Sequence, residues 1–258
     1  MNGACVTISD DGRLAADLAA EAGRRLLARR DRGGDADELR RDGDRLSHEF
    51  LAAELARERP GDAVLSEEGS DDTARLSSSR VWIVDPLDGT REFGEAGRSD
   101  WAVHVALWEA GELTAGAVAL PAEGSVLSTA DPHPAAALAA GNGQLRFMVS
   151  RTRPPEFVQR LSDQAGAALL PLGSAGAKAA QVICGAADAY VHSGGQYEWD
   201  SAAPVAVARA AGLHASRIDG SELRYNQEHP WMPDILICRP ALAGMLLGAI
   251  SSVRQDQE

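Results

Sequence analysis

Lysine is almost absent from this chain of 258 residues. Of its 25 basic residues only one, Lys178, is a lysine, and the acidic residues number 38, which gives a formal net charge of −13. Polynucleotide binding depends on basic surfaces that neutralise phosphates, so this charge argues against it. A small phosphorylated ligand is not excluded, because an acidic site that collects divalent cations becomes locally positive.

Cysteines and long apolar runs are also scarce. The three cysteines, at positions 5, 184 and 238, are too few and too scattered for a disulfide framework or a zinc cluster. No apolar run approaches membrane-spanning length, and the N-terminus lacks the basic-then-apolar order of a signal peptide. We therefore expect a cytoplasmic protein that does not contact membranes.

Helical and strand patterns alternate along the chain. Apolar residues that recur every three or four positions predict helices at 11–30 and 46–57. Short apolar segments predict strands at 63–65, 80–84, 101–108 and 113–120, the last two forming a hairpin. In the second half, the same patterns predict strands at 145–149, 187–191 and 235–238, and helices at 155–165, 175–184, 201–211 and from 240.

This interleaving indicates an α/β or layered α+β fold. The length allows one large domain or two modest ones. The segment 131–143, rich in proline and glycine, is the best candidate for an internal boundary or crossing loop. We therefore divide the chain into an N-terminal half, 1–140, which carries most of the acidic motifs, and a C-terminal half, 141–258, which carries Asp200.

Acidic residues gather at the ends of apolar segments. Asp85 and Asp88 lie three positions apart around a proline in IVDPLDGTREF, residues 83–93. Glu67 and Glu68 follow another expected strand, and Asp200 adjoins an apolar helix. Each acid alone is more often a solvated loop residue, and Asp, Pro and Gly are common in turns. As a group at strand ends, however, the acids favour a site for magnesium, which prefers oxygen ligands.

Three segments together resemble the inositol monophosphatase superfamily of magnesium-dependent, lithium-sensitive phosphatases: SEE at 66–68, VDPLDGT at 84–90 and EWDSAAP at 198–204. The resemblance extends over roughly residues 14–247. It implies an αβαβα layered sandwich, two or three Mg²⁺ ions and inhibition by Li⁺. Dimers are common in the family, so a homodimer is one expected form.

The resemblance also implies a set of metal ligands. These are the side chains of four acids, with one backbone carbonyl in addition: Glu67, Asp85, Asp88, Asp200 and the carbonyl of Leu87. Asp85 would bridge two of the ions. Glu68 is either a supporting residue beside this set or a simple exposed loop acid.

An acid that pairs with the motif threonine, Thr90, would activate the attacking water. Counting back from SEE places this acid at Asp44, within RDGDRLS. The segment departs from the family's usual Thr-x-Ala-Asp, so Asp42 remains a competitor. The resemblance thus implies hydrolysis by activated water, without a covalent intermediate.

Substrate choice depends on further motifs. Arg91-Glu92-Phe93 resembles the Lys-Glu-Phe of the bisphosphate nucleotidase (CysQ-type) branch of the family, although histidinol phosphatases also carry Arg there. Ser174 and Lys178 lie in a stretch that resembles the Gly-Ser-x-x-Lys of the same branch, and Ser150-Arg151 resembles its Ser-Arg. For Lys178 the alternative is a surface lysine without contacts, and for Arg151 an ordinary loop arginine. The full candidate substrate-binding set is Gly89, Thr90, Arg91, Ser150, Arg151, Ser174 and Lys178.

These motifs indicate a magnesium-dependent enzyme that removes the 3′-phosphate of 3′-phosphoadenosine 5′-phosphate to give AMP, as sulfate assimilation requires. Activity on inositol monophosphate or fructose 1,6-bisphosphate is the alternative within the family, and a weakly catalytic metal- or nucleotide-binding regulator is the non-enzymatic one. Haloacid-dehalogenase phosphatases fit poorly because their two aspartates are two apart, and Asp85 and Asp88 are three apart. We expect His104, in an apolar strand-like run, to be structural.

Overall fold

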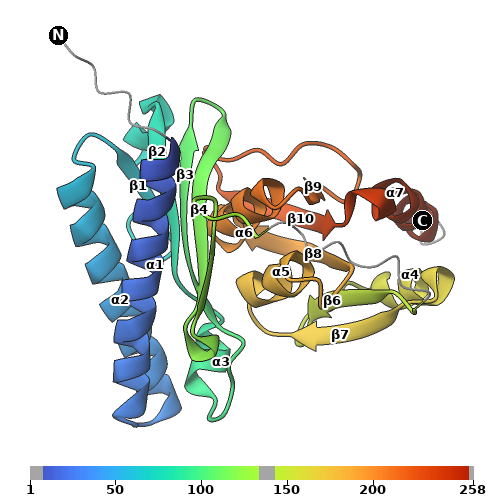
Figure 1. The fold of residues 1–258 in the computed structure, drawn as a ribbon, viewed down its shortest axis with the longest axis horizontal. Coiled ribbons are helices and arrows are strands. Elements are labelled where there is room, and N and C mark those ends of the chain that lie inside the picture. The colour runs from blue at the N-terminus through green and yellow to red at the C-terminus, as the bar shows by residue number, and fades with distance from the viewer. Residues whose placement is uncertain (1–7, 134–142, 256–258) are drawn as a thin grey trace.

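Five layers, alternately helical and sheet, make up the computed structural model, which describes residues 8–133 and 143–255 (Figure 1). Helices α1 and α2 cover one sheet, α5 and α6 lie between the two sheets, and α4 and α7 cover the outer face of the second sheet. The predicted layered α/β fold is therefore confirmed, with the αβαβα order. No helix of the described chain is long and apolar enough to cross a membrane.

The first layer consists of α1 (Ile8–Asp31) and α2 (Ala36–Glu58). Helix α2 begins at Ala36, ten residues before the start predicted at residue 46. The prediction missed this part because the first turns of the helix are strongly charged and show little apolar periodicity. Asp35 caps it by accepting a hydrogen bond from the backbone N–H of Glu38. The two candidate acids, Asp42 and Asp44, therefore lie within a helix and not in a loop before one.

The first sheet has the order β1-β2-β3-β4-β5. Strands β1 and β2 are parallel and the remaining neighbours are antiparallel. The predicted hairpin is present, with Ala110 and Gly111 both at positive φ in its turn. The strands are β1 (Ala63–Ser66), β2 (Arg80–Asp88), β3 (Ala102–Glu109), β4 (Glu112–Leu120) and the unpredicted β5 (Ser125–Ser128).

Small residues allow the middle helices, α5 (Ala175–Ile183) and α6 (Glu198–Ala210), to lie close to the first sheet. A Cβ atom added at Gly116 of β4 would lie 2.7 Å from the Cβ of Ala206 in α6. Alanines make up much of the buried face of both helices. One continuous hydrophobic core accordingly includes Ile83 from the first sheet and Ile235 from the second.

The second sheet has the order β7-β6-β8-β10-β9, with α4 (Val158–Ala165) and α7 (Pro240–Gln255) on its outer face. Its strands are β6 (Arg146–Ser150), β7 (Ala168–Leu172), β8 (Ala189–Tyr197), β9 (His214–Ser216) and β10 (Trp231–Cys238). Strands β7 and β9 were not predicted. Strands β8 and β10 are longer than predicted, because they continue through Gly194-Gly195 and Pro233.

In the sequence, the strands of the first sheet all precede the expected boundary segment, and those of the second sheet all follow it. Residues 134–142 of this segment fall outside the described residues. The division into two domains stays a prediction.

A buried arginine ties the two halves together. Arg75, only 1% exposed, pairs with Asp71 at 2.7 Å and donates to the side-chain oxygen of Asn226, also at 2.7 Å. The backbone N–H groups of Asn226 and Gln227 in turn donate to the carboxylate of Glu198, which opens helix α6. The position of this helix start, and thus of the first turn of α6, depends on the buried arginine.

We expect Arg75→Ala to lower the free energy of unfolding by about 2–3 kcal/mol, since buried acceptors lose a charged donor. The measurement is the midpoint of urea unfolding. Arg57→Ala, which removes an equally ion-paired but exposed arginine of α2, serves as the control and should leave the midpoint unchanged. Equal midpoints for the two variants would show that the Arg75 contacts do not stabilise the fold.

Candidate functional site

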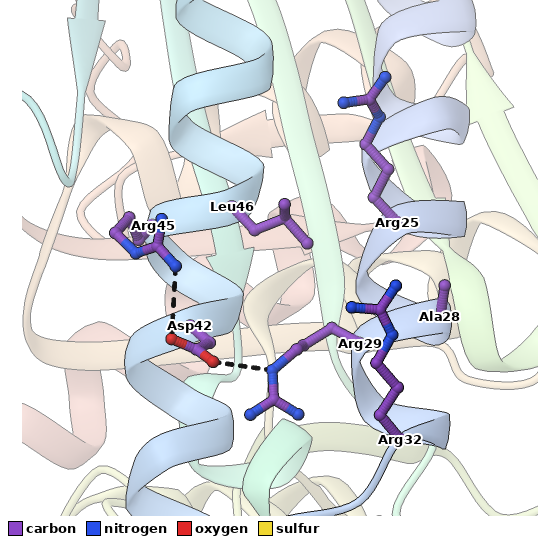
Figure 2. A pocket seen from close by; sticks show the side chains of 7 residues that line it. All are labelled: Arg25, Ala28, Arg29, Arg32, Asp42, Arg45 and Leu46. Atoms are coloured by element: carbon purple, nitrogen blue, oxygen red, sulfur yellow. Dashed lines mark hydrogen bonds and ion pairs between the residues drawn. The ribbon is translucent and has the colours of Figure 1, made fainter.

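Asp42, one of the two candidates for the acid of α2, is held in ion pairs. Its carboxylate lies 2.9 Å from Arg29 of α1 and 3.5 Å from Arg45 of its own helix (Figure 2). The hydrogen bond from Arg29 is the main reason that the pKa of Asp42 is lowered. Figure 2 shows that Asp42 faces a hollow lined by arginines between α1 and α2.

Asp44, by contrast, faces the end of strand β2. The hydroxyl of Thr90 lies 3.2 Å from Oδ1 of Asp44 and 3.0 Å from the carbonyl oxygen of Leu87, so its hydrogen has two acceptors. Burial, and then the charge of Glu68, raise the pKa of Asp44 to about 7. Of the two acids, Asp44 is the one that can exchange a proton near neutral pH at Thr90.

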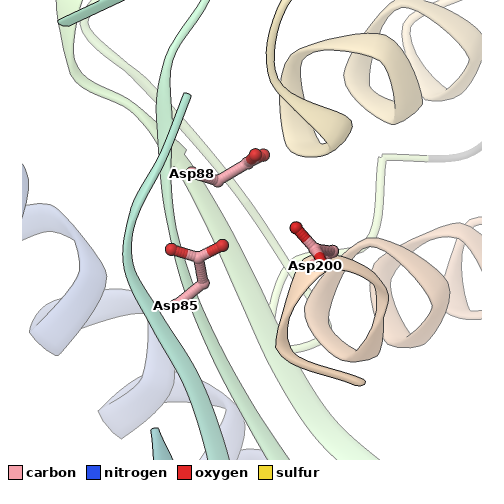
Figure 3. A group of neighbouring side chains, drawn as sticks. All are labelled: Asp85, Asp88 and Asp200. Carbon is pink, nitrogen blue, oxygen red and sulfur yellow. The ribbon is translucent and has the colours of Figure 1, made fainter. Parts of the chain in front are cut away.

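Three carboxylates converge in front of this pair. Asp85 and Asp88 project from the end of β2, where the pairing with β3 shifts register, and Asp200 projects from the first turn of α6 (Figure 3). One oxygen atom from each of the three lies within 4.8 Å of the others. Asp85 and Asp88 are 1% and 7% exposed, so these charges are brought together largely out of contact with water.

Each of the three carboxylates is held through a single oxygen. Oδ1 of Asp85 accepts from the N–H of Leu87 at 3.0 Å, and Oδ2 of Asp200 accepts from the N–H of Tyr197 at 2.6 Å. Oδ2 of Asp88 accepts from the Ser174 hydroxyl and the Gly176 N–H, at 2.6 and 2.7 Å. Among the described residues, no donor hydrogen-bonds to the second oxygen of Asp88 or Asp200, whereas the carboxyl of Glu67 lies within hydrogen-bond reach of Asp85.

Mutual repulsion and burial shift the pKa values of these acids. Burial raises the pKa of Asp85 well above its usual value, and the carboxylates of Glu67 and Asp88 add to this. Burial and the charge of Asp88 raise the pKa of Asp200 to about 6. Asp88 is the exception: burial would raise its pKa, but His104, Lys178 and Ser174 together lower it.

His104, which we expected to be structural, belongs to this site. Its Nε2 lies 3.1 Å from Oδ2 of Asp88, and its Nδ1 lies 3.1 Å from the carbonyl oxygen of Trp199. Both ring nitrogens thus face oxygen acceptors, and the carboxylate of Asp88 raises the pKa of the histidine against the effect of burial. The alternation of side chains along β3 could have indicated that His104 faces the middle layer, because His104 lies on the same face of the strand as Ala102 and Ala106, which belong to that core.

Glu67 reaches the cluster from the end of β1. The residue as a whole is exposed, but its carboxyl group lies beside Asp85. Burial of this carboxyl group raises the pKa of Glu67 to about 7. Glu68 is exposed and acts on Asp44 through its charge. The carbonyl of Leu87, expected as a further ligand, accepts the Thr90 hydroxyl.

A cavity of about 460 Å³ adjoins these acids. Its lining includes five of the residues that the sequence suggested for substrate binding: Gly89, Thr90, Arg91, Ser150 and Lys178. Lys178 is 2% exposed, so the alternative of a surface lysine is wrong. Its ammonium group donates to the carbonyl of Gly173 and lies 5.2 Å from the ring centre of Tyr190. Burial lowers the pKa of Lys178 to about 8, although Asp88 and other acids favour its charged form.

The two remaining candidates, Ser174 and Arg151, are not in the cavity lining and instead contact acidic residues. Ser174 donates to Asp88 and caps α5, accepting from the N–H of Ala177. Arg151 is not among the residues that line the cavity, and its guanidinium pairs with Glu92 and Glu95, both at 2.7 Å. Its role in substrate binding stays a prediction. Arg153 lines the cavity together with Arg91, and the backbone N–H of Arg153 donates to the hydroxyl of Ser150.

Gly89 is the N-cap of the five-residue helix α3 (Thr90–Gly94). Its φ of +88° lies in the left-handed region, and a Cβ atom there would lie 3.1 Å from the Cβ of Ser174. Any other residue would therefore strain the turn that places Thr90 beside Asp44.

The acid cluster fits a divalent cation. Three carboxylates each direct an oxygen toward one point, and burial together with the neighbouring carboxylates raises the pKa values of Asp85 and Asp200. Hard oxygen ligands of this kind suit Mg²⁺ or Ca²⁺ better than metals that prefer nitrogen or sulfur. The residues that would hold such a cation are Asp85, Asp88 and Asp200, with Glu67 at the edge.

Comparisons with known proteins agree on one family. The inositol monophosphatase family model matches residues 12–255. A 3′-phosphoadenosine 5′-phosphate phosphatase of Mycobacterium leprae is 52% identical over 95% of both chains, and one of Mycobacterium bovis is 56% identical over 81% of this chain and 80% of that protein. The crystal structure of CysQ from Bacteroides thetaiotaomicron, a bacterial member of the inositol monophosphatase family, aligns with a TM-score of 0.73 at 27% identity, covering 90% of this chain and 97% of that one.

The raised pKa values predict how pH and cations act on stability. Unfolded carboxyls titrate near pH 4, whereas Asp44, Glu67 and Asp200 titrate near 6–7 in the folded chain. Between these values the folded state holds more protons, so these acids make the metal-free protein less stable as pH rises. At low pH a cation must displace the protons that these carboxyl groups still hold, so it binds more weakly there than at high pH.

We therefore expect 10 mM Mg²⁺ to raise the melting temperature by about 3 °C or more at pH 8 and by much less at pH 5.5. Differential scanning calorimetry with and without EDTA measures both shifts. Asp85→Asn should abolish the shift at pH 8. Equal shifts at both pH values in the unmodified protein would contradict this description of the cluster.

Proposed function

The chain belongs to the inositol monophosphatase family, and we propose that it is a magnesium-dependent phosphatase that converts 3′-phosphoadenosine 5′-phosphate to AMP. The observation that carries the proposal is the meeting of the acid cluster, the Asp44–Thr90 pair and the buried Lys178 around one cavity. The two relatives that are 52% and 56% identical, both named for this reaction, support the choice of substrate.

In the proposed reaction Glu67, Asp85, Asp88 and Asp200 would hold the magnesium ions. When bound, these ions supply the positive charge that lowers the pKa of water and stabilises the charge that develops on the phosphate. Lithium inhibition follows from the same proposal, since Li⁺ would compete for one of these positions.

Asp44 and Thr90 would accept the proton of the attacking water. A pKa of about 7 suits Asp44 as a general base near neutral pH. Thr90 can accept a hydrogen bond from water through its hydroxyl oxygen while its own hydrogen faces Asp44. The proton can thus pass from water through the threonine hydroxyl to Oδ1 of Asp44.

Cationic side chains would favour a substrate with two phosphates. Lys178, Arg91 and Arg153 all line the cavity beside the acid cluster. With a pKa of about 8, Lys178 is mostly charged at neutral pH. One phosphate would lie at the metal ions, and the second would be neutralised by these cations. Cytoplasmic location and a homodimer remain predictions.

The first test compares substrates. We expect kcat/KM for phosphate release in Mg²⁺ to be about a hundredfold higher, or roughly 2.7 kcal/mol in transition-state free energy, for 3′-phosphoadenosine 5′-phosphate than for inositol 1-phosphate. Fructose 1,6-bisphosphate, with two phosphates but no base, is the third arm. A preference for inositol 1-phosphate would overturn the substrate assignment, and no turnover of any of the three would favour a binding regulator.

The second test separates the two acids of helix α2. Asp44→Asn should lower kcat by a factor of about 10² or more, because the general base is lost while the shape of the side chain is kept. Asp42→Asn is the matched control, two residues away on the same helix, and should change kcat by less than about threefold. The reverse order of effects would transfer the role to Asp42.

A further inference from the structure

The arginine-lined hollow between helices α1 and α2 lies in the outer helical layer of the fold (Figure 2). It has a volume of about 300 Å³, and no described residue lines both this hollow and the cavity beside the acid cluster. The proposed reaction therefore gives the hollow no role.

The charge of the hollow is opposite to that of the whole chain. Its lining consists of two apolar residues, one aspartate and four arginines: Asp42, Arg25, Arg29, Arg32 and Arg45. The chain as a whole carries a formal net charge of −13. Four guanidinium groups with one carboxylate thus concentrate positive charge at one place on an acidic protein, and such a place attracts anions.

The arginines stand on both sides of the hollow. Arg25 and Arg29 are four residues apart and lie on one face of α1, and Arg32 directly follows the last residue of that helix. Arg45 projects from α2, the facing helix (Figure 2). Like charges at this helical spacing repel one another, and an anion held between the two helices would offset the repulsion.

Two of the guanidinium groups are held in place by their neighbours. That of Arg25 lies over the ring of Phe50, 4.0 Å from the ring centre. The side chain of Arg29 is only 12% exposed and donates to the carbonyl oxygen of Gly33 at 2.8 Å. Donors that are already ordered lose little conformational entropy when they bind a ligand.

The other two arginines have weak partners. Arg45 is 62% exposed at its side chain, and it reaches the carboxylates of Asp42 and Glu49 only at 3.5 and 3.4 Å. Arg32 is exposed and forms no ion pair with any described residue. Exposed ion pairs contribute little to stability, so a ligand would displace little protein contact here.

The lining favours a small oxyanion over a larger ligand. The planar forks of guanidinium groups match the oxygen atoms of phosphate and sulfate. A volume of about 300 Å³ is at the lower end of the range for ligand sites. The described lining contains no aromatic side chain on which a base could stack.

We propose that the hollow between α1 and α2 binds a multiply charged oxyanion of the phosphate or sulfate class, with Arg29, Arg32 and Arg45 as its donors. Asp42 pairs with Arg29 and Arg45, so its carboxylate competes with the anion for them. This site is separate from the acid cluster, and the inference goes beyond the proposed function and does not depend on it.

The test is isothermal titration calorimetry at pH 8, with sodium sulfate and sodium phosphate as separate probes. EDTA is present, and sodium chloride keeps the ionic strength constant, because exposed charges are screened by salt. Without metal ions the acid cluster repels anions. We expect both probes, which are divalent at this pH, to bind saturably to one site with a Kd of about 1 mM. No saturable binding of either probe would overturn the proposal.

Three variants test the residues of the hollow. The double variant Arg32→Gln/Arg45→Gln should weaken binding about tenfold or more, because two charge-assisted donors are lost from exposed positions. Asp42→Asn should tighten binding roughly threefold or more, since it removes the competing charge. A misfolded variant would not show such a gain. Arg57→Gln, which removes an exposed arginine of α2 outside the hollow, should bind like the unmodified protein.

Other outcomes would overturn the site. Binding that survives the double variant but is lost in Arg153→Gln would place the anion in the cavity beside the acid cluster. An equal loss in Arg57→Gln and in the double variant would show a general effect of net charge. Unchanged binding in Asp42→Asn would contradict the competition with its carboxylate. All titrations are made without magnesium or substrate, so failure of this site leaves the proposed function untouched.

Discussion

The burial of carboxylates at the end of strand β2 is the constraint on which the rest of this structure depends. Isolated buried charges are very costly, and three carboxylates within 4.8 Å of one another also repel. The fold offsets this for one of them. Asp88 accepts hydrogen bonds from the hydroxyl of Ser174 and the N–H of Gly176 in α5, and it lies 3.1 Å from the imidazole of His104; His104, Lys178 and Ser174 together lower its pKa. Asp85 and Asp200 have fewer donors, and burial and the neighbouring carboxylates raise their pKa values. A bound cation would offset this repulsion.

This constraint explains why the start of helix α5 contains glycines. A Cβ atom at Gly176 would come within 2.2 Å of Nε2 of His104, and one at Gly173 within 2.3 Å of the carboxyl carbon of Glu92. The close approach lets the N–H of Gly176 reach Asp88, and it lets Glu92 pair with Arg151 behind the cavity. Because α5 belongs to the second half of the chain and β2 to the first, the packing of these glycines joins the halves at the site itself.

The sequence was sufficient to predict the layered fold and the acids that cluster at the end of β2. It was insufficient to predict side-chain contacts between residues that lie far apart in the chain. Most strands with plain apolar patterns were predicted to within a few residues, but β7 was missed although it is apolar, and the short β5 and β9 carry too little pattern. The start of α2 was missed because its first turns are polar. Nothing local reveals that Arg151 pairs with Glu92 and Glu95 or that Arg153 lines the cavity, so Arg153 was overlooked and the role of Arg151 in substrate binding stays a prediction. His104 resembles any core histidine until Asp88 is placed beside it.

The single lysine is the residue for which composition and structure combine most clearly. In a chain whose other basic residues are all arginines, a lysine that is 2% exposed occupies a place where an arginine would not fit as well. A compact ammonium group can donate to the Gly173 carbonyl and lie over the ring of Tyr190 in the same small space, whereas a planar guanidinium needs a wider set of acceptors. The ammonium also lies close enough to Asp88 and Asp200 to affect their pKa values. Lys178 therefore has two effects here: its charge favours the ionised forms of Asp88 and Asp200, and its side chain lines the cavity beside them.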